Sequence, residues 1–143
     1  MGNRKIKHFV IENKVEELTS LSEKIDKMAE EWELSQALAM NINLVVEEAV
    51  TNIIFYAFKD NDKHEIRISV SLNESMLVIK ITDSGVPFNP LLQQQPDINL
   101  PVEERPVGGL GIFLISQIMD EMNYTRQKNQ NILTLNKSIW YEY

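Results

Sequence analysis

The spacing of apolar residues changes abruptly near residue 60, and this change constrains the fold more than any other feature of the sequence. Between Ser35 and Phe58 the apolar side chains recur every three or four residues over a wide arc, which predicts a central helix packed on more than one side. Between Ile66 and Asp83 they alternate with polar side chains, which predicts an antiparallel hairpin with one buried face.

The remaining segments favour the same architecture. A short β-branched strand is expected at residues 6–13, and an amphipathic helix follows from Val15 to Trp32. Another helix opens within GGLGIFLISQIMDEM (108–122), and a second hairpin at 123–139 turns near Asn129. This order predicts an α+β fold, a two-layer sandwich in which helices pack on one face of a mixed, mainly antiparallel sheet.

The composition limits the kinds of partner. A length of 143 residues and an apolar content of 43% suit one domain spanning 1–143 with a single core. The net charge of -7, with scattered Lys and Arg, argues against nucleic-acid binding, and the absence of cysteine excludes disulfides and thiol chemistry. No segment approaches the roughly 20 apolar residues of a membrane span, and no signal-peptide pattern is evident, so we expect a soluble cytoplasmic protein.

One long segment does not fit regular structure. Residues 84–107 are rich in proline and contain three consecutive glutamines. A connection of this length inside a compact domain is either functional or disordered.

Glu48 and Asn52 stand out within the central helix. They are four residues apart, so their side chains project from the same face about one turn apart. A carboxylate and an amide oxygen in this arrangement suit the hard oxygen ligation that Mg²⁺ prefers. The alternative is that both residues simply form the solvated edge of a buried helix.

Two further motifs lie at the ends of predicted elements. Asp83 ends a strand two residues before Gly85, where a carboxylate can accept a hydrogen bond from an exocyclic amine such as that of adenine. Asp-Ser-Gly is also a common turn composition. Gly108, Gly109 and Gly111 precede a helix, and the N-terminus of a helix suits a phosphate group, although a plain loop-to-helix joint is the alternative.

The order of these motifs resembles the Bergerat-fold ATPases, the superfamily that includes gyrase, Hsp90 and sensor histidine kinases. VEEAVTNII, DSGVPFNP and GGLGIFLISQIMDEM are most similar to the bacterial anti-sigma-factor serine kinases. The resemblance spans roughly residues 5 to 139 and implies the histidine-kinase-like ATPase fold. Many members carry a histidine at the position of Tyr56.

The resemblance also implies roles for individual residues. Glu48 matches the general base, and Asn52 matches the Mg²⁺ ligand that contacts ATP. Glu47, about 100° around the helix, is expected to face solvent. Asp83 matches the aspartate that binds the adenine amine, with Gly85 beside it. The other implied ATP-binding positions are Arg105, Gly109, Leu110 and Gly111, with a mobile lid at about 84–107.

The implied activity is a kinase reaction with ATP and Mg²⁺. The substrate would be a serine of a STAS-domain anti-anti-sigma protein, and the kinase would act as a homodimer that also sequesters a sigma factor. Neither a membrane nor a nucleic acid is an expected partner. The alternative is an ATP-binding regulatory module that holds a protein partner without phosphoryl transfer.

Overall fold

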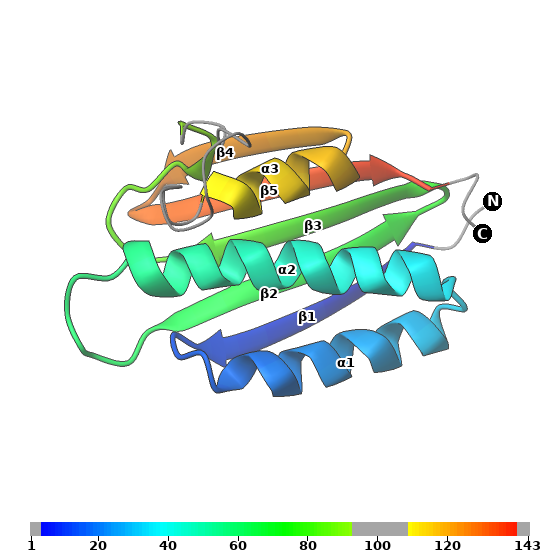
Figure 1. Ribbon diagram of the computed structural model, residues 1–143, viewed down its shortest axis with the longest axis horizontal. Coiled ribbons are helices and arrows are strands. Elements are labelled where there is room, and N and C mark those ends of the chain that lie inside the picture. The colour runs from blue at the N-terminus through cyan, green and yellow to red at the C-terminus, as the bar shows by residue number, and fades with distance from the viewer. Residues whose placement is uncertain (1–3, 93–108, 140–143) are drawn as a thin grey trace.

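The computed structural model describes residues 4–92 and 109–139, with only the backbone path of Gly109 and Leu110. Its five strands form one sheet in the order β1-β2-β3-β5-β4, and all four pairings are antiparallel. Figure 1 shows the helices on one face of this sheet, which confirms the predicted two-layer α+β fold. In chain order the elements are β1 (Lys5–Glu12), α1 (Glu17–Glu31), α2 (Gln36–Tyr56), β2 (Glu65–Asn73), β3 (Met76–Asp83), the 3-10 turn η1 (Pro90–Leu92), α3 (Gly109–Ile118), β4 (Glu121–Gln127) and β5 (Gln130–Ser138).

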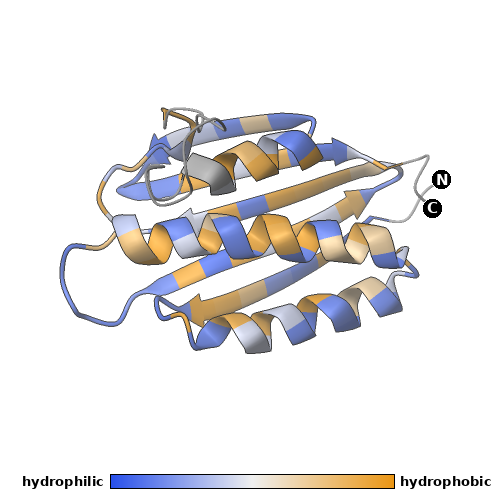
Figure 2. Ribbon diagram, viewed as in Figure 1, coloured by the Kyte–Doolittle hydropathy of each residue, from blue (hydrophilic) through white to orange (hydrophobic). Residues whose placement is uncertain are grey.

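The helix α2 is central, as the wide apolar arc predicts. Ser35 caps its N-terminus, because the Ser35 hydroxyl accepts a hydrogen bond from the backbone N–H of Leu38 at 3.1 Å. The helix contacts α1 on one side, α3 on the other and β3 beneath. Figure 2 shows how apolar residues run along it and along the strands behind it.

The apolar character of α2 also revises one expectation. By length and composition alone this helix is suited to cross a membrane, whereas the sequence was expected to hold no such segment. In the structure it buries its apolar side against the sheet and the two neighbouring helices, as the core helix of a folded domain does. Its buried apolar residues are Leu38, Ile42, Val45, Val46, Ala49, Val50 and Ile53.

The last helix is shorter than its apolar pattern predicts. The helix α3 ends at Ile118. Glu121, the first residue of β4, already pairs with Asn136 of β5, so Met122 belongs to a strand. Two contacts explain this end. The buried ammonium of Lys137 donates to the carbonyl of Ile118 at 3.0 Å, which satisfies a terminal acceptor of the helix. The N–H of Asp120 donates to the carbonyl of Asn136, which starts the sheet pairing.

Candidate functional site

The side-chain nitrogen of Asn52 is a buried polar atom without a hydrogen-bond partner among the described residues. The side chain is 5% exposed, and its Nδ2 atom makes no hydrogen bond to any residue that the structure describes. Buried polar atoms in folded proteins are almost always paired, and an unpaired one costs about 1–3 kcal/mol. The nitrogen and oxygen of a side-chain amide can exchange places without changing its shape, so the unpaired atom is either a nitrogen donor or an oxygen acceptor. In both cases Asn52 is available to a ligand.

Glu48 lies one helical turn before Asn52 and is half-buried. Burial raises the pKa of its carboxyl above the ordinary value, and the neighbouring charge of Glu47 raises the pKa further. The carboxylate meets the first turn of α3, because a Cβ atom added at Gly111 would lie 2.6 Å from its Oε2 atom. Gly111 therefore leaves room for Glu48 between the two helices. A carboxylate with a raised pKa is suited to accept a proton near neutral pH.

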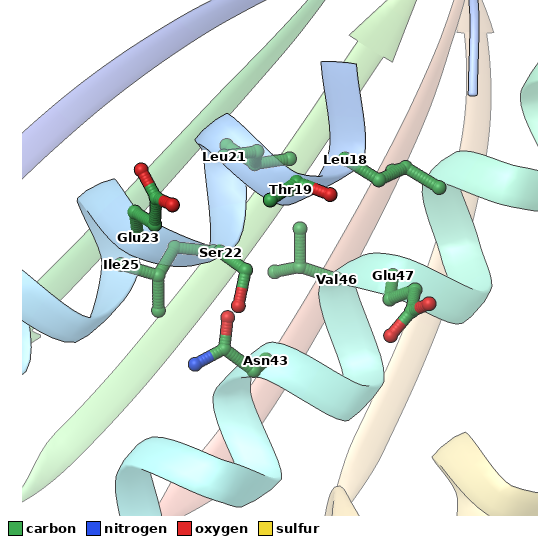
Figure 3. A pocket seen from close by; sticks show the side chains of 9 residues that line it. All are labelled: Leu18, Thr19, Leu21, Ser22, Glu23, Ile25, Asn43, Val46 and Glu47. Atoms are coloured by element: carbon green, nitrogen blue, oxygen red, sulfur yellow. The ribbon is translucent and has the colours of Figure 1, made fainter. Parts of the chain in front are cut away.

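Glu47 faces a different part of the surface. It is exposed, as expected, and it lines a groove of about 300 Å³ between α1 and α2. Figure 3 shows this groove and its other lining residues, with the Glu47 carboxylate beside Val46 and across from α1. The two adjacent glutamates thus meet different surroundings, and only Glu48 contacts α3.

Asp83 lies at the end of β3 and is almost fully buried, with 3% of its surface exposed. Its Oδ1 atom accepts two hydrogen bonds, from the N–H of Gly85 at 2.8 Å and from the amide of Asn131 at 3.0 Å. Burial raises the pKa of the Asp83 carboxyl, while these two bonds and the charge of Arg126 act in the opposite direction. Asp83 and Asn52 line one cavity, although they come from different elements.

Asn131 organises this cavity, and the sequence analysis missed it. Besides Asp83, its amide group donates to the carbonyl of Val86 at 2.8 Å, and its oxygen accepts from the N–H of Phe88 and from the hydroxyl of Tyr124. The residue is 4% exposed and therefore depends on these partners. The sequence shows only that Asn131 falls on the same face of the last strand as the inward-facing leucines. That position does not reveal its hydrogen-bond partners.

The cavity is narrow in this conformation. It leaves a volume of about 10 Å³, close to the minimum that holds one water molecule. Phe88 and Pro90 line it from the segment after β3, and the ring of Phe88 stacks on Tyr56 with centroids 5.7 Å apart. A purine base needs more room than this, so binding of a base here would require lining residues such as Phe88 and Pro90 to move.

Gly85 fixes the distance between the end of β3 and the end of α2. A Cβ atom at this position would lie 2.3 Å from the carbonyl oxygen of Ala57, which accepts a hydrogen bond from the N–H of Val86 at 2.7 Å. The obstacle is backbone, so it cannot rotate away. The family resemblance implies that Gly85 contacts ATP, and the structure shows that Gly85 also has a packing role.

We expect Gly85→Ala to lower the free energy of unfolding by about 1–3 kcal/mol, because the added methyl group forces β3 away from α2. Urea unfolding followed by circular dichroism measures the change. Ser84→Ala is the matched control, since Ser84 is exposed, and it should shift the value by no more than about 0.5 kcal/mol. Equal unfolding midpoints for both variants would contradict the packing role of Gly85.

The glycine-rich motif lies differently from its expected position. Gly109 and Gly111 belong to the first turn of α3 rather than to a loop before it. Leu110 lies between them in the same turn. Arg105, Gly108 and the lid beyond Leu92 fall outside the described residues, so their expected contacts with ATP stay predictions.

The fold and the site residues agree with one known family of proteins. The chain belongs to the histidine kinase-like ATPase domain family, because the model of that family matches residues 11–137. It therefore carries an ATP-binding domain. The histidine kinase domain of the blue-light activated histidine kinase from Erythrobacter litoralis EL346 has a similar fold, with a TM-score of 0.53 and 18% identity over 87% of this chain and 60% of that one.

Within this family, the chain is similar in sequence to serine-protein kinases. Serine-protein kinase RsbW from Bacillus mycoides (strain KBAB4) is 37% identical over 97 residues, which cover 65% of this chain and 60% of that protein. Serine-protein kinase RsbW from Bacillus cereus (strain ATCC 10987 / NRS 248) matches with the same identity and coverage. The chain thus spans about 60% of the length of these relatives.

Proposed function

We propose that this protein is an ATP-dependent serine kinase that phosphorylates a STAS-domain anti-anti-sigma protein. The proposal includes a cytoplasmic homodimer that also sequesters a sigma factor. Its support is the similarity to serine-protein kinases named RsbW together with the motifs that resemble anti-sigma-factor kinases. The single observation that carries the chemistry is the half-buried carboxylate of Glu48, one turn from the unpaired amide of Asn52.

The described residues fit a magnesium ion that is bound mainly through the nucleotide. They contain no cluster of three His, Asp or Glu side chains that would hold a metal by itself. Mg²⁺ commonly keeps several waters and takes only one or two protein ligands beside substrate phosphates. With the side-chain amide turned so that its oxygen occupies the place of the unpaired nitrogen, Asn52 suits one such ligand, and Glu48 lies one turn away. A bound Mg²⁺ would neutralise charge on the phosphates.

In the proposed reaction, Glu48 accepts the proton of the substrate serine hydroxyl. The serine oxygen then forms its bond to the γ-phosphorus while the bond to the β–γ bridging oxygen breaks, and ADP leaves. Asp83 accepts a hydrogen bond from the adenine amine and thereby orients the nucleotide, and Asn131 holds Asp83 in position. The roles proposed for Arg105, Gly109, Leu110 and Gly111 are contacts with the phosphates.

Incubation of the protein with γ-labelled ATP, Mg²⁺ and any STAS-domain protein that a neighbouring gene encodes tests this proposal. We expect label on a serine of the partner, identified by mass spectrometry after electrophoresis. Calorimetry with ATP and Mg²⁺ provides the parallel measurement of binding. Binding without transfer to any such partner would contradict the kinase proposal and support the regulatory module instead.

A further inference from the structure

Three lysines that are scattered along the sequence gather at one edge of the folded molecule. Lys7 from β1 and Lys24 and Lys27 from α1 line a groove of about 280 Å³. The remaining lining residues are His8, Phe9, Val10 and Met28. In the sequence these lysines do not form a basic patch, because they lie in two separate elements.

The two flanks of α1 face different neighbours. The carboxylate of Asp26 accepts a hydrogen bond from Asn43 of α2 at 2.8 Å, so that flank faces α2. Around the helix, Lys24 is about 160° and Lys27 about 100° from Asp26, and both lie beside β1. Their flank therefore opens toward the edge of the sheet.

The edge beside these lysines belongs to β1. This strand pairs only with β2 among the described residues, and Figure 1 shows it as the outermost strand, with α1 running alongside. A strand that is paired on one side presents alternate N–H and C=O groups along its other side. The groove follows the four consecutive residues 7–10 of β1, so it runs parallel to that row of backbone groups.

The groove is positive on a chain whose net charge is -7. Lys24 and Lys27 have no ion pair within the part of the chain that the structure describes. Lys7 is 3.9 Å from Glu31, but both side chains are about half exposed, and such a pair contributes little. A carboxylate from a partner can therefore replace Glu31 at little expense.

We propose that this groove binds an extended acidic segment of a partner protein, which adds as a strand to β1 and pairs its carboxylates with Lys24 and Lys27. The lysines select for negative charge, and the strand edge selects for extended backbone. A second copy of this chain fits less well, because pairing of two β1 edges would bring the lysines of both copies together. The proposal goes beyond the kinase activity, since it requires neither ATP nor phosphoryl transfer.

Titration of the ¹⁵N-labelled protein with a synthetic peptide of five Val-Glu repeats, without nucleotide, tests the proposal. We expect the amide signals of residues 5–10 to shift and the binding to weaken as salt increases. A peptide of five Val-Gln repeats should bind at least about tenfold more weakly, since it lacks the carboxylates. A peptide of five Pro-Glu repeats should also bind at least about tenfold more weakly, since proline removes backbone donors.

A charge-reversal pair identifies the surface. The double variant Lys24→Glu/Lys27→Glu should weaken binding of the Val-Glu peptide by at least about tenfold. Lys59→Glu/Lys63→Glu makes the same change of charge on the exposed loop between α2 and β2 and should leave the affinity within about twofold. Unfolding midpoints of both variants check that they fold.

Three outcomes would overturn the proposal. Equal weakening by both double variants would mean that only net charge matters, and equal binding of the Pro-Glu peptide would mean that no strand is added. Sedimentation of the wild type as a dimer that Lys24→Glu/Lys27→Glu disrupts would mean that a second copy occupies this edge. None of these results depends on the kinase assay, so the two proposals fail separately.

Discussion

Glu48→Gln should lower the rate of phosphoryl transfer by at least about 100-fold, while the dissociation constant of ATP changes by no more than about threefold. Glutamine keeps the shape of the side chain in the space beside Gly111 but cannot accept the serine proton. Single-turnover transfer from labelled ATP measures the rate, and calorimetry measures the affinity.

Glu47→Gln is the matched control for this variant. This substitution removes the charge next to Glu48, on the side of α2 that faces the groove with α1. The variant should retain most of the activity. Equal losses in both variants would mean that the local charge, rather than a base at Glu48, supports transfer.

The raised pKa of Glu48 should make both activity and stability depend on pH. A base must be deprotonated, so activity should fall with decreasing pH at a value above the ordinary range of glutamate. The folded state holds this proton more tightly than the unfolded chain does, so stability decreases as the pH rises through the raised pKa. Glu48→Gln should therefore raise the melting temperature at neutral pH, which separates loss of activity from loss of folding.

The second large effect concerns Asp83. Asp83→Asn should weaken ATP binding by between about 10- and 100-fold, because a hydrogen bond to a charged acceptor contributes about 1.5–3 kcal/mol. The affinity for GTP should fall less, since an asparagine amide can donate to the oxygen that guanine carries in place of the adenine amine. Competition between the two nucleotides in a fluorescence assay measures this preference.

Asp62→Asn serves as the control for Asp83→Asn, because Asp62 is exposed on the loop after α2 and lies outside the cavity. It should leave both nucleotide affinities unchanged. An Asp83→Asn variant with unaltered ATP affinity would remove Asp83 from the adenine site, even if the protein remained an active kinase.

Local patterns in the sequence predict most of this fold. The hairpin of β2 and β3 follows from alternation, since the inward positions are apolar except for Asp83 at the end of β3, and most of the residues between them are polar. The central helix follows from its long 3.6-residue period. The end of α3 does not, because Met122 suits a helical stripe and an inward strand position equally well, and the Lys137 contact that decides between them comes from a distant strand.

The candidate site could be predicted only in part. Glu48 and Asn52 share a helix, so their spacing fixes their relation, and Asp83 falls at a recognisable strand end. Asn131 bonds to residues more than 40 positions away, and no local pattern encodes those bonds. Likewise, the stack of Phe88 on Tyr56 joins two aromatic residues whose proximity depends on the path of the chain after β3.

If the narrow cavity is the adenine site, as we propose, its opening sets how the protein responds to nucleotide concentration. If only a fraction of molecules has Phe88 and Pro90 moved aside, the apparent affinity equals the intrinsic affinity multiplied by that fraction. An open population of about one in a hundred would raise the apparent dissociation constant about 100-fold. Anything that opens this segment, including a bound partner protein, would then act as a positive effector of ATP without touching the nucleotide.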